Sequence, residues 1–501
     1  MFPVCLLALA TGFLSLSMEI LWIRLFSFAN FSMPQSFSFV LACYLVGIAL
    51  GSSVGKWFCQ STDQLWKVCG CTLLISSLLD LSSPWLYSLS VYTHWQLLAA
   101  GGLITLTSLL KAIPFPIAHH LGAYTANTHI GRKISRVYVC NILGSTMGPL
   151  FTGILLLTVM TTQQSFIVCS ALTFLVALFC LLQSVSVWLL GMSAAAMTGV
   201  ILMILTVNSH ALIKAIGDKS HGKIIDVVEN QFGIVSTYPD VNNGVIVMGG
   251  NVYDGRTNLD PVLNSNRISR LIVLSTLVEK PKQVLMIGLS IGSWLKIVTS
   301  FPGIENIDVV EINPGYLELI KHYPAQQSAL DDPRVHLFIN DGRRWLNMHP
   351  DRRYDLIIMN TTYHWRAYAS NLLSEEFLRM IKRHMNPNAV LSYNSTWSPD
   401  VLKTATEVFN YAYLYNSFII AADFDWRQKL NSPQAENIIR NLKLDGKLLY
   451  PPGSDKSIAS VISEKLLSLP EVEALASSKG RSLEIITDQN LITEFKYGRK
   501  L

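Results

Sequence analysis

The first 207 residues consist mainly of long apolar stretches, and this feature restricts the possible folds more than any other. A helix needs about 20 consecutive apolar residues to cross the ~30 Å hydrocarbon core of a bilayer. Stretches of about that length occupy residues 3–25, 36–57, 68–90, 95–114, 137–160, 163–183 and 186–207. We therefore predict a multi-pass membrane bundle of about seven helices. The third stretch is the weakest candidate because it contains Asp80 and Pro84.

Two of these stretches carry glycines at four-residue spacing, which lets helices approach closely in lipid. The glycines are Gly47, Gly51 and Gly55 in the second stretch, and Gly144 and Gly148 in the fifth. Tight helix packing is a better-supported interpretation of this spacing than a substrate path.

Charged residues make up 15% of the chain, against about 25% in an ordinary soluble domain. The deficit lies in the apolar half, and the rest has the composition of a globular protein. The net charge of +5 is small for 501 residues and gives no reason to expect nucleic acid as a partner. All eight cysteines lie in the apolar half, so the globular half has no thiol nucleophile. No His or Cys lies near Cys69 and Cys71 to complete a zinc site, and no metal is predicted.

The globular half predicts a small β-rich segment followed by an α/β domain. Asn242-Asn243-Gly244 joins two β-type runs and predicts a hairpin turn. From Gln283 onwards apolar runs alternate with helical segments, and the predicted strands are 284–287, 307–310, 335–339 and 354–359. Such alternation predicts a doubly wound parallel sheet. We expect a membrane domain over 1–210, a β-rich lead-in over 211–275 and the α/β domain over 276–501.

Glycines and acids follow the first three strands of the predicted sheet. Gly288 and Gly292 lie in the turn after the first strand, where glycine lets a ligand approach the backbone N–H groups at a helix N-terminus. Glu311 ends the second strand and suits the hydroxyls of a ribose. Asp341 follows the third strand and can accept hydrogen bonds from a base edge. This order predicts a nucleotide site; the less favoured alternative is that the glycines are simple turn residues and Glu311 is a solvated cap.

These and other segments of the globular half are shared with one family. The matching segments are Val310-Glu311-Ile312-Asn313-Pro314, Asp332-Pro333-Arg334-Val335, Asn340-Asp341-Gly342, Tyr354-Asp355-Leu356-Ile357-Ile358 and Ser374-Glu375-Glu376-Phe377. Over about residues 223–413 the chain resembles the spermidine synthase-like branch of S-adenosylmethionine-type transferases. The apolar half is similar to the membrane segment fused to such domains in many bacterial proteins. The resemblance implies a membrane α-helical bundle followed by a Rossmann-like, methyltransferase-type sheet.

By this resemblance, the cosubstrate is S-adenosylmethionine or its decarboxylated form. The residues that it assigns to the cosubstrate are Gly288, Ser290 and Gly292 at the amino-acid or aminopropyl portion, Glu311 at the ribose, and Asp341 with Gly342 at the adenine. In the family, a nucleophile attacks the carbon beside the sulfonium, and positioning supplies most of the catalysis. A carboxylate after the fourth strand deprotonates the acceptor amine.

The chain departs from the family pattern after the fourth strand. The polyamine-transferring members carry two acids there, and this chain has Asn360 and Tyr363 at those positions. An amide cannot take a proton from an ammonium group, so we expect a non-polyamine acceptor. Histidine has a reference pKa of about 6.5, so His364 could act as a general base, and Arg366 could hold a carboxylate or phosphate. Structural packing of His364 and helix capping by Arg366 are equally open.

We therefore expect a membrane-tethered transferase that moves a methyl or an aminopropyl group to a small-molecule acceptor. Asn360, His364 and Arg366 are its predicted catalytic residues. The alternative is a non-catalytic nucleotide-binding or regulatory membrane protein that retains the fold. The lipid bilayer is a predicted partner, and a homo-oligomer is left open.

Basic residues beside the predicted spans bear on orientation in the cell membrane. They are Lys56 and Lys67 at one loop, and Lys111, Arg132, Lys133 and Arg136 at another. The positive-inside rule places both loops in the cytoplasm. Seven spans would then place the globular half outside, whereas six or eight would place it in the cytoplasm. We predict the cytoplasmic side, where a nucleotide cosubstrate is within reach.

Overall fold

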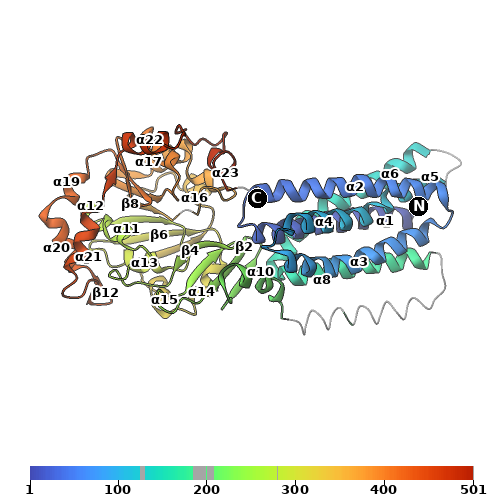
Figure 1. Cartoon of the computed structure of the whole chain (residues 1–501), viewed down its shortest axis with the longest axis horizontal. Helices are drawn as coiled ribbons and strands as arrows, with labels where there is room; N and C mark the ends of the chain where they lie inside the picture. The colour runs from blue at the N-terminus through green and yellow to red at the C-terminus, as the bar shows by residue number, and fades with distance from the viewer. Residues whose placement is uncertain (125–129, 184–198, 200–207, 279, 361, 500) are drawn as a thin grey trace. The chain divides into compact units, whose positions relative to one another are not determined.

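The computed structural model describes the chain except for residues 125–129, 184–198, 200–207, 279, 361 and 500 (Figure 1). The described chain forms two compact units. One comprises Met1–Phe31 and Gln35–Gly233, and the other comprises Ser32–Pro34 and Ile234–Leu501. This division falls after the sequence-based boundary at residue 210, because α10 (Ala211–His221) packs on α3 and α8 of the helical unit. Strand β1 (Val227–Asn230) belongs to the same unit.

Within the described residues, six helical segments of the first unit are long and apolar enough to cross a membrane. They are α1 (Phe2–Ala29), α2 (Gln35–Ser61), α3 (Leu65–Ser90), α4 (Gln96–Ala112) with α5 (Pro114–Tyr124), α6 (Ile130–Leu150) continued by π-helical η1 (Phe151–Leu156) and α7 (Leu157–Val159), and α8 (Thr162–Leu182). The first six predicted spans coincide with these segments. The seventh predicted span, 186–207, lies outside the described residues apart from Gly199.

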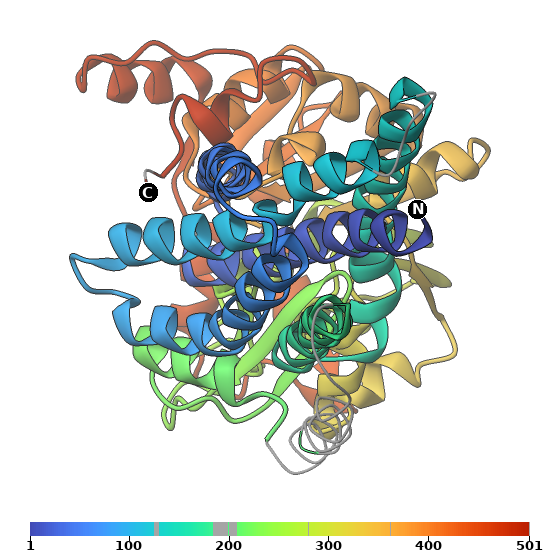
Figure 2. The ribbon, with the colours of Figure 1, turned by 90° about the vertical axis from the view of Figure 1, so that its right-hand side faces the viewer.

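The helices of this unit pack in pairs: α1 against α6, α2 against α4, and α3 against α8 (Figure 1, Figure 2). Glycines line two of these contacts, as their spacing predicts. A Cβ atom on Gly51 would lie 2.2 Å from the carbonyl oxygen of Leu109, and one on Gly144 would lie 2.0 Å from that of Leu9. The helix backbones therefore approach too closely for any larger residue.

The acid in the third span has a buried partner. The ammonium group of Lys111 on α4 donates to the carboxylate of Asp80 on α3 and to the hydroxyl of Ser76, at 3.1 Å. Both charged side chains are almost completely buried. Because opposite charges at membrane depth compensate each other, α3 can keep Asp80 within its apolar run. The assignment of Lys111 to a loop flank was wrong, and it carries no weight in the orientation argument.

The second unit is built on an eight-stranded sheet in the order β14-β10-β11-β9-β8-β5-β6-β7. The strands are β5 (Gln283–Ile287), β6 (Asn306–Glu311), β7 (Val335–Ile339), β8 (Tyr354–Met359), β9 (Met385–Asn394), β10 (Tyr411–Tyr415), β11 (Phe418–Ala422) and β14 (Leu466–Leu467). Strands β5 to β9 are parallel, and the others form an antiparallel edge. The chain order reverses at β5, so the predicted doubly wound, Rossmann-like fold is confirmed. Ligands of such sheets bind at the carboxyl ends of the strands beside this reversal.

Helices α16 (Gly342–Met348), α17 (Glu375–Arg383) and α18 (Pro399–Thr406) pack on the sheet through one apolar core. That core joins Trp345, Phe377 and Leu402 to strand residues such as Ile357. The remaining elements are α11 (Ser269–Ile272), α12 (Leu274–Leu277), α13 (Ser293–Val298), α14 (Gly315–Ile320), α15 (Pro324–Leu330), η2 (Ala369–Leu372), α19 (Arg427–Leu430), α20 (Pro433–Asn441), β12 (Lys443–Leu444), β13 (Lys447–Leu448), α21 (Asp455–Ile462), α22 (Leu469–Ser477) and α23 (Ile492–Phe495).

An antiparallel meander precedes the large sheet. Its strands β2 (Gly233–Tyr238) and β3 (Ile246–Gly249) pair around the hairpin predicted at Asn242-Asn243-Gly244. Strand β4 (Val252–Arg256) pairs with the other edge of β3. The sequence does not predict β4, because Asp254 and Gly255 at its centre are poor strand formers. Residues of β4 nevertheless form one wall of the site described below.

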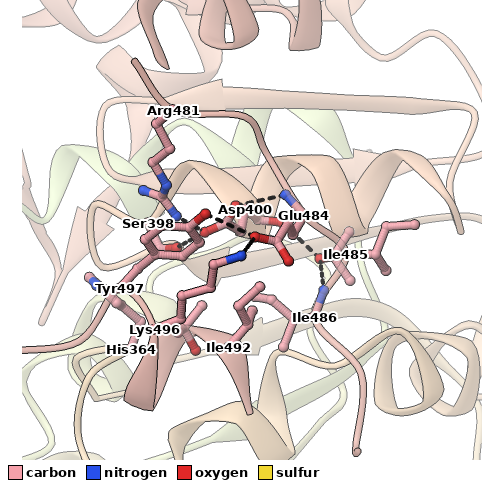
Figure 3. Close-up of polar contacts among 12 residues, drawn as sticks. His364, Ser398, Asp400, Arg481, Glu484, Ile485, Ile486, Ile492, Lys496 and Tyr497 are labelled. Carbon is pink, nitrogen blue, oxygen red and sulfur yellow. Dashed lines mark hydrogen bonds and ion pairs between the residues drawn. The ribbon is translucent and has the colours of Figure 1, made fainter. Parts of the chain in front are cut away.

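A buried acid holds the C-terminal segment against α18 (Figure 3). The carboxylate of Asp400 is fully buried, pairs with the Arg481 guanidinium and accepts the backbone N–H of Glu484 at 3.0 Å. Arg481 also lies 3.6 Å from the centroid of the Tyr497 ring. The hydroxyl of Tyr497 donates to the Glu484 carboxylate at 2.8 Å. This cluster fixes the end of the chain beside the loop that follows β9.

Candidate functional site

The turn after β5 has the backbone conformation for which its glycines are required. Gly288 and Gly292 have φ angles of +90° and +82°, in the left-handed region that glycine adopts at little cost. A Cβ atom on Gly288 would also lie 2.7 Å from the carbonyl oxygen of Asn360. The turn therefore brings the first and fourth strands of the parallel sheet together at their carboxyl ends.

Glu311, the last residue of β6, is 4% exposed and faces this turn. Its carboxylate accepts the backbone N–H groups of Leu289 and Asn313, each at 2.8 Å. Burial raises the pKa of Glu311 to about 7, although the hydrogen bonds from those N–H groups lower the pKa. Each carboxylate oxygen retains a lone pair for a further donor. Glu311 thus ties the turn to β6 and keeps acceptor capacity at the sheet edge.

Asp341 and Gly342 lie at the same edge, after β7. Asp341 is exposed and caps α16, where its carboxylate accepts the backbone N–H of Arg344 at 2.8 Å. Gly342 packs against Ile287, since a Cβ atom there would lie 2.7 Å from that side chain. Both residues flank the end of β5 and do not line the cavity that opens beside it.

A cavity of about 320 Å³ lies within the second unit, beside the turn after β5. Small-molecule pockets start at about this size. Its walls come from β4, the loop leading into α11, the turn itself, and the residues that follow β8 and β9. The lining residues are Tyr253, Asp254, Gly255, Arg256, Ser265, Asn266, Arg267, Arg270, Leu289, Ser290, Ile291, Ser293, Trp294, Asn360, Thr362, Tyr363, Asn394, Thr396, Trp397 and Ser417. Of the predicted site residues, Ser290 and Asn360 line this cavity.

His364 lies outside the cavity wall. Its backbone N–H donates to the Thr396 hydroxyl at 2.8 Å, and its Nδ1 lies 2.9 Å from the Thr396 carbonyl oxygen. Burial lowers the pKa of His364, and the nearby positive charge of Arg481 lowers it further. Figure 3 shows His364 among the side chains around Tyr497. The geometry supports a structural role in which His364 positions the loop after β9.

Arg366 also lies behind the wall. Its Nη1 donates to the Thr362 hydroxyl at 3.1 Å, and its guanidinium lies against the turn between β3 and β4. Its positive charge faces Asp254, whose carboxyl is hydrogen-bonded to Tyr316 and whose backbone carbonyl accepts the Ser290 hydroxyl at 3.2 Å. Burial raises the pKa of Asp254, while Tyr316 and the charge of Arg366 lower it. Arg366 therefore stabilises the ionised form of Asp254, the one carboxylate among the lining residues.

Three arginines line the cavity, and none of them is among the site residues predicted from the sequence. Arg256 pairs with Asp240, which neutralises its charge. Arg270 on α11 is 8% exposed and donates to the Ser417 hydroxyl at 2.7 Å. Arg267 is exposed at the rim, 5.4 Å from the centroid of the Trp397 ring. Residue spacing gives no signal for them, because Arg267 lies outside α11 with a φ of +51° and does not share a helix face with Arg270.

No group of three or more His, Cys, Asp or Glu side chains with metal-binding geometry occurs among the described residues. The site is thus a glycine turn with a buried acid, next to a polar cavity whose charged lining residues are three arginines and one aspartate.

Comparison with known proteins bears on this sheet and turn. Residues 268–414 match the model of the spermine/spermidine synthase domain. The chain is similar to spermine and spermidine synthases over this stretch. The polyamine aminopropyltransferase of Alkaliphilus oremlandii (strain OhILAs) is 40% identical over 84 residues, which are 17% of this chain and 29% of that protein. The spermine synthase of Arabidopsis thaliana is 28% identical over 171 residues, or 34% of this chain and 46% of that protein.

The chain therefore spans less than half the length of these curated relatives. A crystal structure of spermidine synthase in complex with the transition state analogue AdoDATO is 17% identical, with a TM-score of 0.41. That match covers 48% of this chain and 85% of the spermidine synthase.

Proposed function

We propose that this protein is a membrane-tethered transferase that uses an S-adenosylmethionine-type cosubstrate on a small, non-polyamine acceptor. The observation that carries the proposal is the glycine turn, which is hydrogen-bonded to buried Glu311 and lies beside a polar cavity. In that cavity Asn360 and Tyr363 stand where the polyamine-transferring relatives carry two acids. The match to the spermine/spermidine synthase domain supports the reaction class, transfer of a methyl or an aminopropyl group.

In this proposal the cosubstrate lies across the turn at the carboxyl edge of β5, β6 and β7. The ribose hydroxyls would donate to Glu311, and the adenine would lie near Asp341 and Gly342. Its sulfonium end would enter the cavity past Gly288, Ser290 and Gly292, of which Ser290 lines the wall. This assignment is supported by three strand ends that meet at one edge of a parallel sheet.

Catalysis would rest on positioning, which can supply much of the barrier reduction when two reactants are held in line. Asn360 lines the cavity and would orient the acceptor by hydrogen bonds. Asp254 is the carboxylate available for proton transfer, and burial raises its pKa towards the range that suits a general base. His364 and Arg366 would act behind the wall by holding Thr396, Thr362 and Asp254.

The membrane helices would anchor this unit to the bilayer on the cytoplasmic side. Six described segments have the length and apolarity that this requires. A C-terminal reporter enzyme that is active only in the cytoplasm should be active, and a reporter that is active only outside should be silent. The opposite pattern would place the cosubstrate out of reach and end this part of the proposal.

A non-catalytic nucleotide-binding module is the second candidate, and the replacement of both family acids favours it. Membranes containing the protein should release labelled product from methyl- or aminopropyl-labelled cosubstrate when supplied with cell metabolites. The Glu311→Ala variant should lose that signal, whereas Arg427→Gln, outside the cavity, should keep it. Nucleoside binding without labelled product in any fraction would favour the binding module.

A further inference from the structure

The cavity wall contains two positively charged side chains, Arg267 and Arg270. Among the described residues, no carboxylate forms an ion pair with Arg267 or Arg270. Arg256, in the same wall, is paired with Asp240. Asp254 is held by Tyr316 and Ser290 and faces Arg366. The uncompensated charge in the cavity is therefore positive, in contrast to a site that attracts polyamines.

Arg270 is oriented by its surroundings and not by an ion pair. Its guanidinium lies 4.5 Å from the centroid of Phe418 and 5.2 Å from that of Trp294. Its Nη1 donates to Ser417 at 2.7 Å, and its Nε donates to the Arg267 carbonyl at 3.1 Å. The aromatic faces and two acceptors fix the guanidinium but supply no full negative charge. A planar donor held in this way is pre-organised for an anion.

Placing this cation in the wall costs free energy when no anion is present. Burial lowers the pKa of Arg270 to about 9, and the positive charge of Arg267 contributes to the same shift. Two like charges that face one cavity are stabilised when an anion enters between them. The polar lining and the exposed position of Arg267 at the rim leave a path for such an anion.

We propose that Arg267 and Arg270 form a subsite that binds a carboxylate of the reacting pair. This inference rests on the proposed function, because the same cavity would hold the cosubstrate's sulfonium end and the acceptor. The ring of Trp294, which lies under the Arg270 guanidinium, belongs to the first turn of α13, directly after the glycine turn, so the subsite adjoins the predicted amino-acid portion of the cosubstrate. The carboxylate would come either from intact S-adenosylmethionine or from an acidic acceptor.

The test is titration of the full-length protein in detergent with S-adenosylmethionine, its decarboxylated form and methylthioadenosine. If the cosubstrate supplies the carboxylate, S-adenosylmethionine should bind about tenfold or more tightly than the decarboxylated form, as expected for a charge-assisted pair. Arg270→Gln should abolish that preference and leave methylthioadenosine binding unchanged. Arg427→Gln is the control: Arg427 also lies over an aromatic ring, that of Tyr413, but outside the cavity, so this variant should keep the preference.

Succinate, titrated at saturating methylthioadenosine, tests the second source. The carboxylate would be assigned to the acceptor if Arg270→Gln weakens succinate binding while the protein binds S-adenosylmethionine and its decarboxylated form equally well. If Arg270→Gln does not fold, the exposed Arg267→Gln provides the same comparison. Equal or tighter binding of the decarboxylated form, together with no arginine-dependent succinate binding, would overturn the subsite. Failure of methylthioadenosine to bind the folded protein would instead count against the proposed function, and succinate alone would still test the subsite.

Discussion

At the scale of single residues, burial shifts the pKa values of the acids and the histidine at this site. Glu311 and Asp254 both have carboxyl pKa values raised by burial, and the pKa of His364 is lowered by it. All three groups therefore favour their neutral forms more than they do in water. A ligand that donates hydrogen bonds to Glu311 would reverse this effect, because it stabilises the carboxylate.

This predicts that nucleoside affinity rises with pH. With a pKa of about 7 in the free protein, Glu311 is mostly protonated at pH 6 and mostly ionised at pH 8. If the ribose hydroxyls require the carboxylate, methylthioadenosine should bind about tenfold more tightly at pH 8 than at pH 6. The raised pKa also means that the stabilising contribution of Glu311 to the fold is lost as pH rises from about 4.5 to 7.

Calorimetric titration across this pH range measures the effect. Methylthioadenosine is the suitable ligand because it has no amino-acid group that titrates. The Glu311→Gln variant should show weak binding with no such rise. Affinity that stays constant or falls between pH 6 and pH 8 in the unchanged protein would mean that the Glu311 carboxylate is not the ribose acceptor.

At the scale of elements, the turn after β5 is the piece of backbone on which the site depends. Gly288→Ala should destabilise the fold and abolish nucleoside binding, because the new methyl meets the Asn360 carbonyl and the φ of +90° is strained. We expect a loss of about 2–4 kcal/mol in the free energy of unfolding, from strain and overpacking together. Gly446→Ala is a matched control, since its φ is +79° with open space around it.

Gly446→Ala should cost about 1 kcal/mol and leave binding intact, because it introduces strain without a clash. Denaturant unfolding and calorimetry of the two variants separate these contributions. Similar costs for both substitutions would show that the turn tolerates a methyl and that Gly288 is not required by the approach of Asn360.

The contact between α3 and α4 supplies a second prediction at this scale. Lys111→Met leaves Asp80 buried without a counter-charge and should lower stability by about 3–5 kcal/mol. The double variant Asp80→Leu with Lys111→Met should recover most of that loss, because both charges are then removed. Thermal unfolding in detergent measures this, with exposed Lys56→Met as the control. An Lys111→Met protein as stable as that control would contradict a compensating pair.

At the scale of the whole molecule, the sequence predicts those helices and strands that can be recognised from the residue pattern of one short stretch of chain. Strands β5, β6 and β8 are buried on both faces and appear as apolar runs, and the six candidate spans of the first unit are apolar over 21 to 30 residues. The turn glycines and Glu311 could be predicted because their positions relative to the strands follow from chain order. The same reasoning misses β4, whose central Asp254 and Gly255 give no strand signal.

The cavity could not be derived from the sequence, because its arginines depend on partners remote in the chain. Arg270 is held by Ser417 and Phe418, and Arg256 is neutralised by Asp240 across the meander. Likewise, the loop after β8 directs Asn360 into the cavity and leaves His364 and Arg366 behind the wall. Side-chain direction in an irregular loop is set by tertiary contacts that residue spacing does not encode.

The central claim is that the turn and Glu311 form a nucleoside site next to an acceptor cavity. Titration of the purified full-length chain with methylthioadenosine tests it most directly, with Glu311→Ala and Arg427→Gln measured in parallel. We expect saturable binding of one nucleoside per chain that Glu311→Ala removes and Arg427→Gln retains. A folded protein that binds no nucleoside, or binds it equally well without Glu311, would contradict the claim and leave only the likeness in fold.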